Sequence, residues 1–372
     1  MNCICSQREL KDALTAASKA LPVKPQTPIL NGFYISAHDN QLEIQATDFA
    51  LGIIAKIPAE IENEGTIVVN GKNITEIIGK LEGDIVTIST DENGNSAIFK
   101  SESTTFSLYT MDAEDFPKVS SQEFQHSFFI KNSVLKSLIA RSTFSASNDD
   151  SRPIFQGCLV SIEGSTITFV ATNTHRLVVV KSEIENDIPG ENQFIVPAKT
   201  LNDVMSIINS AREDKGVKID FSDKHIAFTI NDIFVICRLI DGQFPPYQKV
   251  IPASCETFAT VDIADFRSAI NRVEIISKQT EYNTVMLNFN EEGLKLSSTS
   301  YDMGKVDTHV NSAVEGQSVE IAFNLRYIQE FLRIAGGSDE VRIGMNDKLS
   351  PADFRLTNNQ DLIYIVTPVR AQ

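Results

Sequence analysis

The sequence predicts an α+β protein made of three repeated domains, each with two helices on mainly antiparallel sheets. Three observations support this fold class. One segment recurs at an offset of 125 residues, apolar residues at helical spacing occur in six places, and polar turns separate strands that follow one another along the chain. Strands joined as hairpins form antiparallel sheets, and helices alongside them define the α+β class.

The repeat is clearest between residues 27–49 and 152–177, and a fainter third copy covers 283–303. The first two copies share a Pro-Ile pair, a glycine and an Ala-Thr pair, namely Pro28-Ile29 with Pro153-Ile154, Gly32 with Gly157, and Ala46-Thr47 with Ala171-Thr172. We therefore expect domains at 1–124, 125–252 and 253–372. No Gly/Ser-rich or Pro-rich linker separates them, so we expect the repeats to pack edge to edge through continuous sheet.

Each domain has the same order of elements. A helix precedes the repeated hairpin, a short strand and a second helix follow it, and a strand pair closes the domain. The six helix windows are 7–21, 70–81, 131–145, 198–212, 262–278 and 324–335. In the first domain the closing pair is expected to turn at 92–95, where polar residues separate alternating strands. Each copy is expected to hold roughly eight strands.

Composition indicates an ordinary globular chain of 372 residues with five cysteines. The cysteines are too few and scattered for a disulfide framework, and Cys3 and Cys5 lack the spacing of zinc ligands. No apolar run is long enough to span a membrane, and the N-terminus does not read as a signal peptide. We expect a reduced, soluble, cytoplasmic protein with no cofactor and no metal site.

Charge is distributed unevenly along the chain. The formal net charge is −16, which by itself argues against binding to nucleic acid. The six helix windows, however, hold fifteen Lys and Arg against eight Asp and Glu, while the remainder holds 18 against 41. If the helices share one surface, that surface attracts phosphate. The alternative is that helices simply tolerate Lys and Arg well.

The stretch "ATNTHRL", residues 171–177, places His175 beside Arg176. Nucleophilic catalysis would need a Ser or Cys with a base and an orienting carboxylate, and phosphate cleavage would usually need carboxylates that hold a metal. The other histidines share no spacing with His175, so no catalytic residue is expected. A structural strand residue and a binding residue at a domain joint remain as alternatives.

At "ATNTHRL", "DGQFPPYQKVIP" and "YIVTPVR" the sequence resembles the bacterial DNA sliding clamps, the β subunits of the replicative DNA polymerase III holoenzyme. The resemblance covers the whole chain. It implies a head-to-tail homodimer that forms a ring around double-stranded DNA, with helices lining the hole and no catalytic activity. It also implies that a short linear motif tethers the replicative DNA polymerase, clamp-loader subunits and repair or translesion proteins to the clamp, which is cytoplasmic and associated with the nucleoid.

The resemblance implies a peptide-binding pocket between the second and third domains. Its residues would be Phe155, Thr172, Thr174, His175, Arg176, Leu177, Pro245, Lys249, Val250, Ile365, Val366, Thr367, Pro368, Val369 and Arg370. Family members often carry Gly at position 174, Arg at 249, and Met at 367 and 369. Because Met is a flexible filler, the pocket floor here is expected to be narrower and less adaptable.

Two further surfaces follow from the resemblance. The dimer interface would place Phe106 and Leu108 of one subunit against Ile275 and Ile276 of the next. The DNA-facing residues would be Lys24, Lys72, Lys80, Lys136 and Lys199. In the loop 148–154, Asp149, Pro153 and Ile154 replace polar and aromatic residues that touch DNA in the family.

Two other functions remain as alternatives. A peptide-binding scaffold without a DNA role would keep the pocket, and the charge of the helices argues against it. A metal-dependent hydrolase on a repeated α+β fold would need a carboxylate and histidine cluster, which the sequence does not offer.

Overall fold

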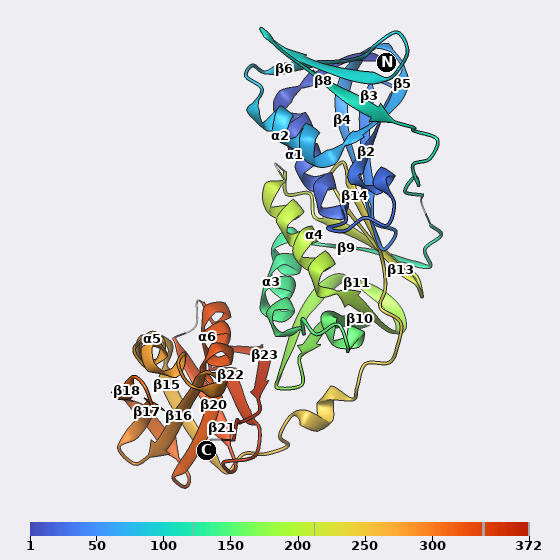
Figure 1. Cartoon of the computed structure of the whole chain (residues 1–372). Coiled ribbons are helices and arrows are strands. Elements are labelled where there is room, and N and C mark those ends of the chain that lie inside the picture. Colours follow the sequence, from blue (N-terminus) through green and yellow to red (C-terminus); the bar gives the residue numbers. More distant parts are fainter. Residues whose placement is uncertain (121, 212, 337–338, 371–372) are drawn as a thin grey trace. The chain divides into compact units, whose positions relative to one another are not determined.

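The computed structural model describes residues 1–120, 122–211, 213–336 and 339–370 (Figure 1). The chain divides into two compact units. One unit comprises Met1–Lys136 with Thr200–Leu239, and the other comprises Ser137–Lys199 with Ile240–Gln372. The chain passes between the units within the two helices of the central repeat, so that repeat contributes to both.

The first unit contains one large antiparallel sheet with helices against it. Its elements in chain order are β1 (Asn2–Ser6), α1 (Gln7–Ala17), η1 (Ser18–Ala20), η2 (Pro28–Asn31), β2 (Gly32–His38), β3 (Gln41–Thr47), β4 (Leu51–Asn63), β5 (Gly65–Asn70), α2 (Gly71–Lys80), β6 (Ile85–Thr90), β7 (Ser96–Ser101), β8 (Thr104–Met111), β9 (His126–Ile130), most of α4 (Ala198–Ser210), β12 (Val217–Phe221), β13 (His225–Ile230) and β14 (Ile233–Arg238). The strands join in the order β1-β6-β7-β8-β5-β2-β3-β4-β14-β13-β12-β9. The turn predicted at 92–95 lies between β6 and β7, as expected.

The second unit contains two antiparallel sheets. Its elements are most of α3 (Asn132–Ser142), η3 (Thr143–Ser145), η4 (Pro153–Gln156), β10 (Gly157–Thr172), β11 (Arg176–Pro197), η5 (Tyr247–Val250), β15 (Thr257–Asp262), α5 (Ile263–Ser277), η6 (Glu281–Asn283), β16 (Thr284–Asn290), β17 (Gly293–Ser300), β18 (Gly304–Val310), β19 (Ser312–Glu315), β20 (Val319–Asn324), α6 (Leu325–Ile334), β21 (Glu340–Met345), β22 (Ala352–Leu356) and β23 (Asn359–Val366). The strand orders are β10-β11-β23-β22-β21-β15-β19 and β18-β17-β16-β20.

Helices α1, α2, α5 and α6 begin where a strand ends, and a polar side chain caps each of these junctions. Ser6 accepts a hydrogen bond from the Glu9 amide at the start of α1, and Asn70 accepts one from the Asn73 amide at the start of α2. Asp262 caps α5 in the same way. Such caps satisfy amide groups that have no partner within the helix. The predicted helices therefore form at the predicted places.

The sheets continue from one repeat into the next within each unit, as the sequence predicts. In the first unit, residues 51–55 of β4 pair with residues 233–237 of β14. In the second unit, residues 176–180 of β11 pair with residues 362–366 of β23. The latter pairing brings the end of the chain beside the "ATNTHRL" segment. The predicted boundaries at 124 and 252 stay predictions.

Strand number in the central repeat differs from the expected eight. Its described part forms six strands, because two long strands, β10 and β11, replace four shorter ones. The pairing of β10 with β11 runs from Gly157 to Thr172 with register shifts around Gly164, which has a φ of +59°. Because glycine adopts this backbone conformation freely, the chain bends there without ending the strand.

Candidate functional site

The turn between β10 and β11 is organised by the side chains of two polar residues. The Thr172 hydroxyl donates to the Arg176 carbonyl at 2.6 Å and accepts from the Thr174 amide at 3.1 Å. The Asn173 carboxamide oxygen accepts from the amides of His175 and Arg176, both at 3.1 Å. These bonds add to a backbone bond from the Asn173 amide to the Arg176 carbonyl at 3.3 Å, which closes the tip of the hairpin. They hold Thr174 at a φ of +75°, a conformation that a β-branched residue rarely adopts.

The last strand lies beside this turn. Leu177 is opposite Ile365 in the pairing of β11 with β23. Beyond the ladder, the amide and hydroxyl of Thr367 both donate to the His175 carbonyl at 2.9 Å. The Val369 amide then donates to the Ala322 carbonyl at 2.9 Å. The structure therefore brings the predicted segments 172–177 and 365–369 together, although about 190 residues separate them along the chain.

An apolar cluster lies beneath the two strand ends. Leu177 and Ile365 are buried in it, together with Leu159, Val170, Val179 and Ile195. The segment 240–251 covers the cluster with Ile240, Phe244, Tyr247 and Ile251. From the same segment Pro245, Lys249 and Val250 point outward, and Val250 is 44 % exposed. The third predicted segment, 245–250, therefore lies beside the segments 172–177 and 365–369.

Arg176, one of the predicted pocket residues, is buried inside the protein. Its side chain pairs with Glu330 of α6 and donates to the Phe144 carbonyl. The guanidinium also lies over the Tyr327 ring, 4.6 Å from its centroid. Because Arg176 and Leu177 are neighbours on one strand, their side chains point to opposite faces. Arg176 thus supports the site from behind.

A polar hollow of about 500 Å³ lies on the Arg176 side of the strand ends. Four of the predicted residues line it, namely Phe155, Thr174, His175 and Arg176. They are joined by residues that the sequence did not indicate, among them Asn324, which caps α6, and Tyr327 and Glu330 within α6. Tyr327 and Glu330 are three residues apart on one helix face, a spacing visible in the sequence. Nothing in the sequence says that this face meets residue 176.

The predicted residues near the C-terminus divide between surroundings. Ile365 and Val366 are buried in the sheet, while Thr367, Pro368 and Val369 are half-buried beyond it. Arg370 is exposed and lines a different hollow of about 870 Å³, with Tyr282, Tyr301, Lys305 and Glu320. Residues 371–372 lie outside the described residues. The C-terminal segment therefore offers a half-buried apolar strip that ends in a cation.

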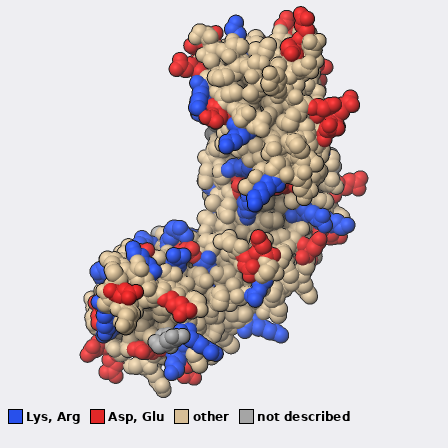
Figure 2. Space-filling view, viewed as in Figure 1, with Lys and Arg blue, Asp and Glu red and all other residues tan. Residues whose placement is uncertain are grey.

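Four of the five lysines predicted to face DNA lie on helices. Lys72 and Lys80 are on α2, Lys136 is on α3 and Lys199 is on α4, whereas Lys24 lies in the loop before η2. Lys80 donates to Glu76 at 2.6 Å, which offsets part of its charge. Figure 2 shows basic and acidic side chains mixed on the face that it presents. With fifteen basic against eight acidic residues, the helix windows have a modest local excess of positive charge.

The residues predicted for the dimer interface lie on exposed elements. Phe106 and Leu108 belong to β8, and Phe106 is 36 % exposed. Ile275 and Ile276 belong to α5, and Ile275 is 57 % exposed. Among the residues that the structure describes, β8 pairs with β7 alone from Thr104 to Tyr109, and β18 is the end strand of its sheet. Both strands therefore have free backbone groups along one edge.

Cys3 and Cys5 lie on one buried face of β1, as their alternation predicts, and burial raises the pKa of the Cys3 thiol to about 11. The described part of the chain has no group of three His, Cys, Asp or Glu side chains placed to hold a metal ion. Nor does any helix in those ranges have the length and apolar character needed to cross a membrane.

Three family models match the chain in succession. They describe the N-terminal, central and C-terminal domains of the DNA polymerase III beta subunit and match residues 1–120, 129–246 and 248–370. Fold and site together define a replication protein with the three-domain sliding-clamp fold. The chain belongs to the DNA polymerase III beta subunit family, the bacterial beta sliding clamps, which are polymerase processivity factors.

Individual relatives agree with this assignment. The beta sliding clamp of Bacillus subtilis is 28 % identical over 97 % of both chains. Its crystal structure superposes with a TM-score of 0.94 at 26 % identity, and that of the Thermotoga maritima beta subunit with 0.93 at 28 %, both over the full length of each chain. A sliding clamp from Pseudomonas aeruginosa bound to griselimycin superposes with a TM-score of 0.93 at 26 % identity.

Proposed function

We propose that two copies of this chain form a head-to-tail ring that encircles duplex DNA, slides along it and tethers other proteins, without catalysing a reaction itself. The observation that supports the ring is that two strands have a free edge, β8 in the first repeat and β18 in the third. A contact between two different surfaces of identical subunits closes into a ring when the rotation allows it. Phe106 and Leu108 meet Ile275 and Ile276 across each contact.

DNA is held by Lys72, Lys80, Lys136 and Lys199 on the helices, together with Lys24 in the loop before η2. A lining with few cations in a chain of net charge −16 binds a short duplex weakly. Retention therefore depends on the closed ring and not on affinity for a sequence. The protein works in the cytoplasm, at the nucleoid.

Partner proteins dock where the strand ends meet. The pocket is formed by the predicted residues 172–177, 245–250 and 365–370 with Phe155, and its apolar lining is Leu177, Val250, Pro368 and Val369. His175 and Thr367 fix the polar part of the ligand, and Arg176 holds the wall from behind. An apolar site with a few placed polar groups suits a short motif in the replicative polymerase, the clamp loader and repair or translesion proteins.

The test is retention on DNA of different topology. The protein is loaded by a clamp loader on a nicked circular plasmid, and the complex is isolated by gel filtration before and after a restriction enzyme linearises the circle. We expect retention on the circle and loss after cutting. Lys136→Glu with Lys199→Glu should weaken loading, less so at high salt because salt screens the charges. Equal retention on circular and linear DNA contradicts the ring, and no retention on either favours the peptide-binding scaffold without a DNA role.

A further inference from the structure

A second turn in the first repeat has the same hydrogen bonds as the turn at 172–176. The Thr47 hydroxyl donates to the Leu51 carbonyl at 3.0 Å and accepts from the Phe49 amide at 3.0 Å. The Asp48 carboxylate accepts from the amides of Ala50 and Leu51, at 3.0 and 2.7 Å. Phe49 takes the position of Thr174 and, like it, has a positive φ, here +71°. The hairpin that builds the candidate site is therefore repeated in detail.

The surroundings of the two turns also correspond. An added Cβ on Gly32 would lie 2.7 Å from Met111, and one on Gly157 would lie 2.8 Å from Ile240. Met111 and Ile240 each precede the similar segments "DAEDFP" and "DGQFP". Glycine at 32 and 157 thus lets the closing segment of each repeat pack against the sheet. The first repeat therefore builds the same kind of joint as the second.

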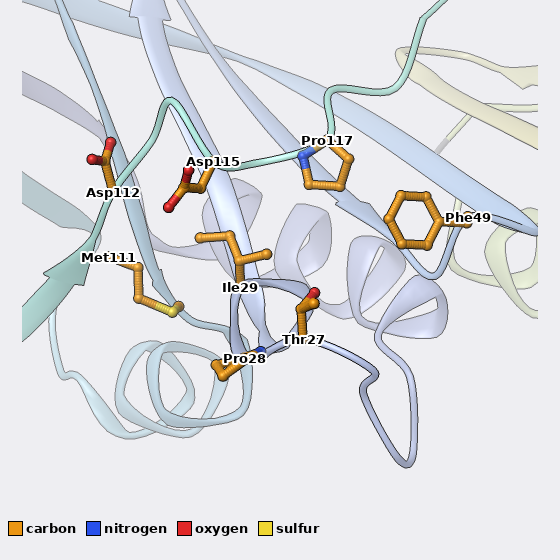
Figure 3. A pocket seen from close by; sticks show the side chains of 8 residues that line it. All are labelled: Thr27, Pro28, Ile29, Phe49, Met111, Asp112, Asp115 and Pro117. Atoms are coloured by element: carbon orange, nitrogen blue, oxygen red, sulfur yellow. The ribbon is translucent and has the colours of Figure 1, made fainter.

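A pocket of about 560 Å³ opens beside the Phe49 turn, entirely within the first unit (Figure 3). Its lining comes from three segments of the chain, and the residues are Thr27, Pro28, Ile29, Phe49, Met111, Asp112, Asp115 and Pro117. The floor rests on stacked rings of Tyr34 and Phe116, whose centroids are 5.5 Å apart. This size is within the range of sites that take a small ligand or a few side chains.

Phe49 is the unusual member of this lining. Its side chain is 64 % exposed, and its backbone has a conformation that costs a bulky residue of order 1–3 kcal/mol. Figure 3 shows its ring beside Pro117, with Ile29 and Met111 toward the other end of the pocket. Burying an exposed aromatic ring against a ligand is favourable, and the flexible Met111 side chain adapts to the shape of what enters.

Two carboxylates give this pocket an acidic end. Asp112 and Asp115 are exposed there, next to the apolar floor (Figure 3). The polar hollow at the candidate site instead has charges of both signs in its lining, namely Asp149, Arg152, Arg326 and Glu330. Complementary charges steer partners and reject those of the wrong sign. The acidic end of this pocket therefore favours a ligand that carries a cation.

We propose that this pocket is a second docking site, which binds an extended protein segment that carries an apolar side chain next to Lys or Arg. The apolar side chain lies against Phe49, Ile29 and Met111. The cation pairs with Asp112 and Asp115.

The test uses two fluorescein-labelled peptides, Gly-Lys-Leu-Phe-Lys-Gly and its charge-inverted form Gly-Glu-Leu-Phe-Glu-Gly, measured by anisotropy on the full chain. An excess of unlabelled Gln-x-x-Leu-Phe peptide first fills the candidate site. We expect the basic probe to bind at least tenfold more tightly than the acidic probe. The double variant Asp112→Asn/Asp115→Asn should lose about five- to tenfold in affinity, as expected for two exposed ion pairs. Phe49→Ala should lose about tenfold.

The matched control is Glu60→Gln/Glu64→Gln, which removes the same charge from exposed positions elsewhere in the first repeat. It should leave affinity for the basic probe within about twofold, since distant exposed charges are screened. The proposal is overturned if the aspartate and glutamate variants weaken binding equally, or if the Gln-x-x-Leu-Phe peptide displaces the basic probe completely. Neither outcome bears on retention of the protein on circular DNA, so the two proposals fail independently.

Discussion

Arg176, the first residue of β11, forms an ion pair with Glu330 of α6 and thereby ties the central repeat to the third within one unit. The Arg176 side chain is 6 % exposed, so Glu330 is the counter-ion of a buried guanidinium. Replacing Glu330 by Gln should lower the free energy of unfolding by about 2 kcal/mol, because a buried cation is left without its counter-ion. Glu330 is itself partly exposed, which keeps the cost below that of a fully buried pair. Urea denaturation measures the change.

The matched control for this pair is Glu320→Gln. Glu320 is exposed on β20 and accepts a hydrogen bond from Asn288 at 3.0 Å. An exposed carboxylate contributes little to the free energy of unfolding, so this variant should change that free energy by less than about 0.5 kcal/mol. Equal losses in the two variants would show that the Arg176 pair has no special part in joining the repeats.

Thr174→Gly should stabilise the protein. Thr174 has a φ of +75°. The strain energy that this conformation costs a threonine exceeds the extra entropic cost of folding a chain with glycine at this position. We expect a gain of about 1 kcal/mol in the free energy of unfolding. Thr174→Ala keeps a side chain at the same φ and should give no such gain. If the glycine variant is no more stable than the alanine variant, the positive φ of Thr174 does not destabilise the protein.

Removing the side chains of Phe106 and Ile275 should leave folded monomers. Both side chains are exposed in the single chain, so their loss weakens the proposed ring contact without opening the core. Sedimentation velocity at micromolar concentration measures the change, and circular dichroism confirms folding. Tyr109→Ala is a useful control, since Tyr109 is on the same strand and 88 % exposed but lies outside the predicted contact. A persistent dimer in the Phe106→Ala/Ile275→Ala variant would place the interface elsewhere.

Ending the chain after Thr367 should abolish binding of a Gln-x-x-Leu-Phe peptide, because the half-buried strip formed by Pro368 and Val369 is lost. For the intact chain we expect a dissociation constant of about micromolar, or roughly 8 kcal/mol. Isothermal titration measures both. The Thr367 hydrogen bonds to His175 remain in the shortened chain, so the dimer and its retention on DNA should be unchanged. Equal affinity in both chains would place the pocket elsewhere and leave residues 172–177 as the end of a strand.

Cys255 should react first with a thiol reagent. It is half-buried, whereas Cys3, Cys5, Cys158 and Cys237 are buried. Burial raises the pKa of Cys5 and Cys158 to about 12, so these thiols stay protonated and unreactive in the folded protein. Mass spectrometry after brief alkylation at pH 8.5 identifies the labelled site. Prior labelling of Cys158 would contradict the packing of β10.

The same thiols make the protein less stable at alkaline pH. In the unfolded chain they ionise near pH 8.5, while in the folded chain Cys3, Cys5 and Cys158 keep their protons to pH 11 or 12. Their contribution to stability is therefore complete below about pH 8.5 and is lost as the pH rises toward those values. Urea midpoints at pH 8, 9 and 10 should fall in that order.

The repeat and the helices could be predicted from the sequence because each depends on local patterns. The window 70–81, for example, contains α2 together with its capping Asn70. The position of Arg176 could not be predicted in this way. Alternation along a strand places Arg176 and Leu177 on opposite faces, but which face meets Tyr327 and Glu330 depends on residues about 150 positions away.

The sequence contains a partial indication of the second pocket, the one beside Phe49. The likeness of "DAEDFP" to "DGQFP" indicates that both segments close a repeat. It does not indicate that a cavity remains between Met111, Phe49 and Ile29, since cavities depend on the volumes of side chains that only the fold brings together. Local pattern thus locates the joints, and packing decides whether each one is open.

The pairing of β4 with β14 also affects the growing chain on the ribosome. The edge of β4 at residues 51–55 stays uncovered until residues 233–237, about 180 positions later, have been synthesised. At typical elongation rates of about 5–20 residues per second, the edge stays open for roughly 10–35 seconds. An uncovered strand edge readily pairs with another chain. Early translation is therefore the period in which this protein most needs chaperones to prevent aggregation.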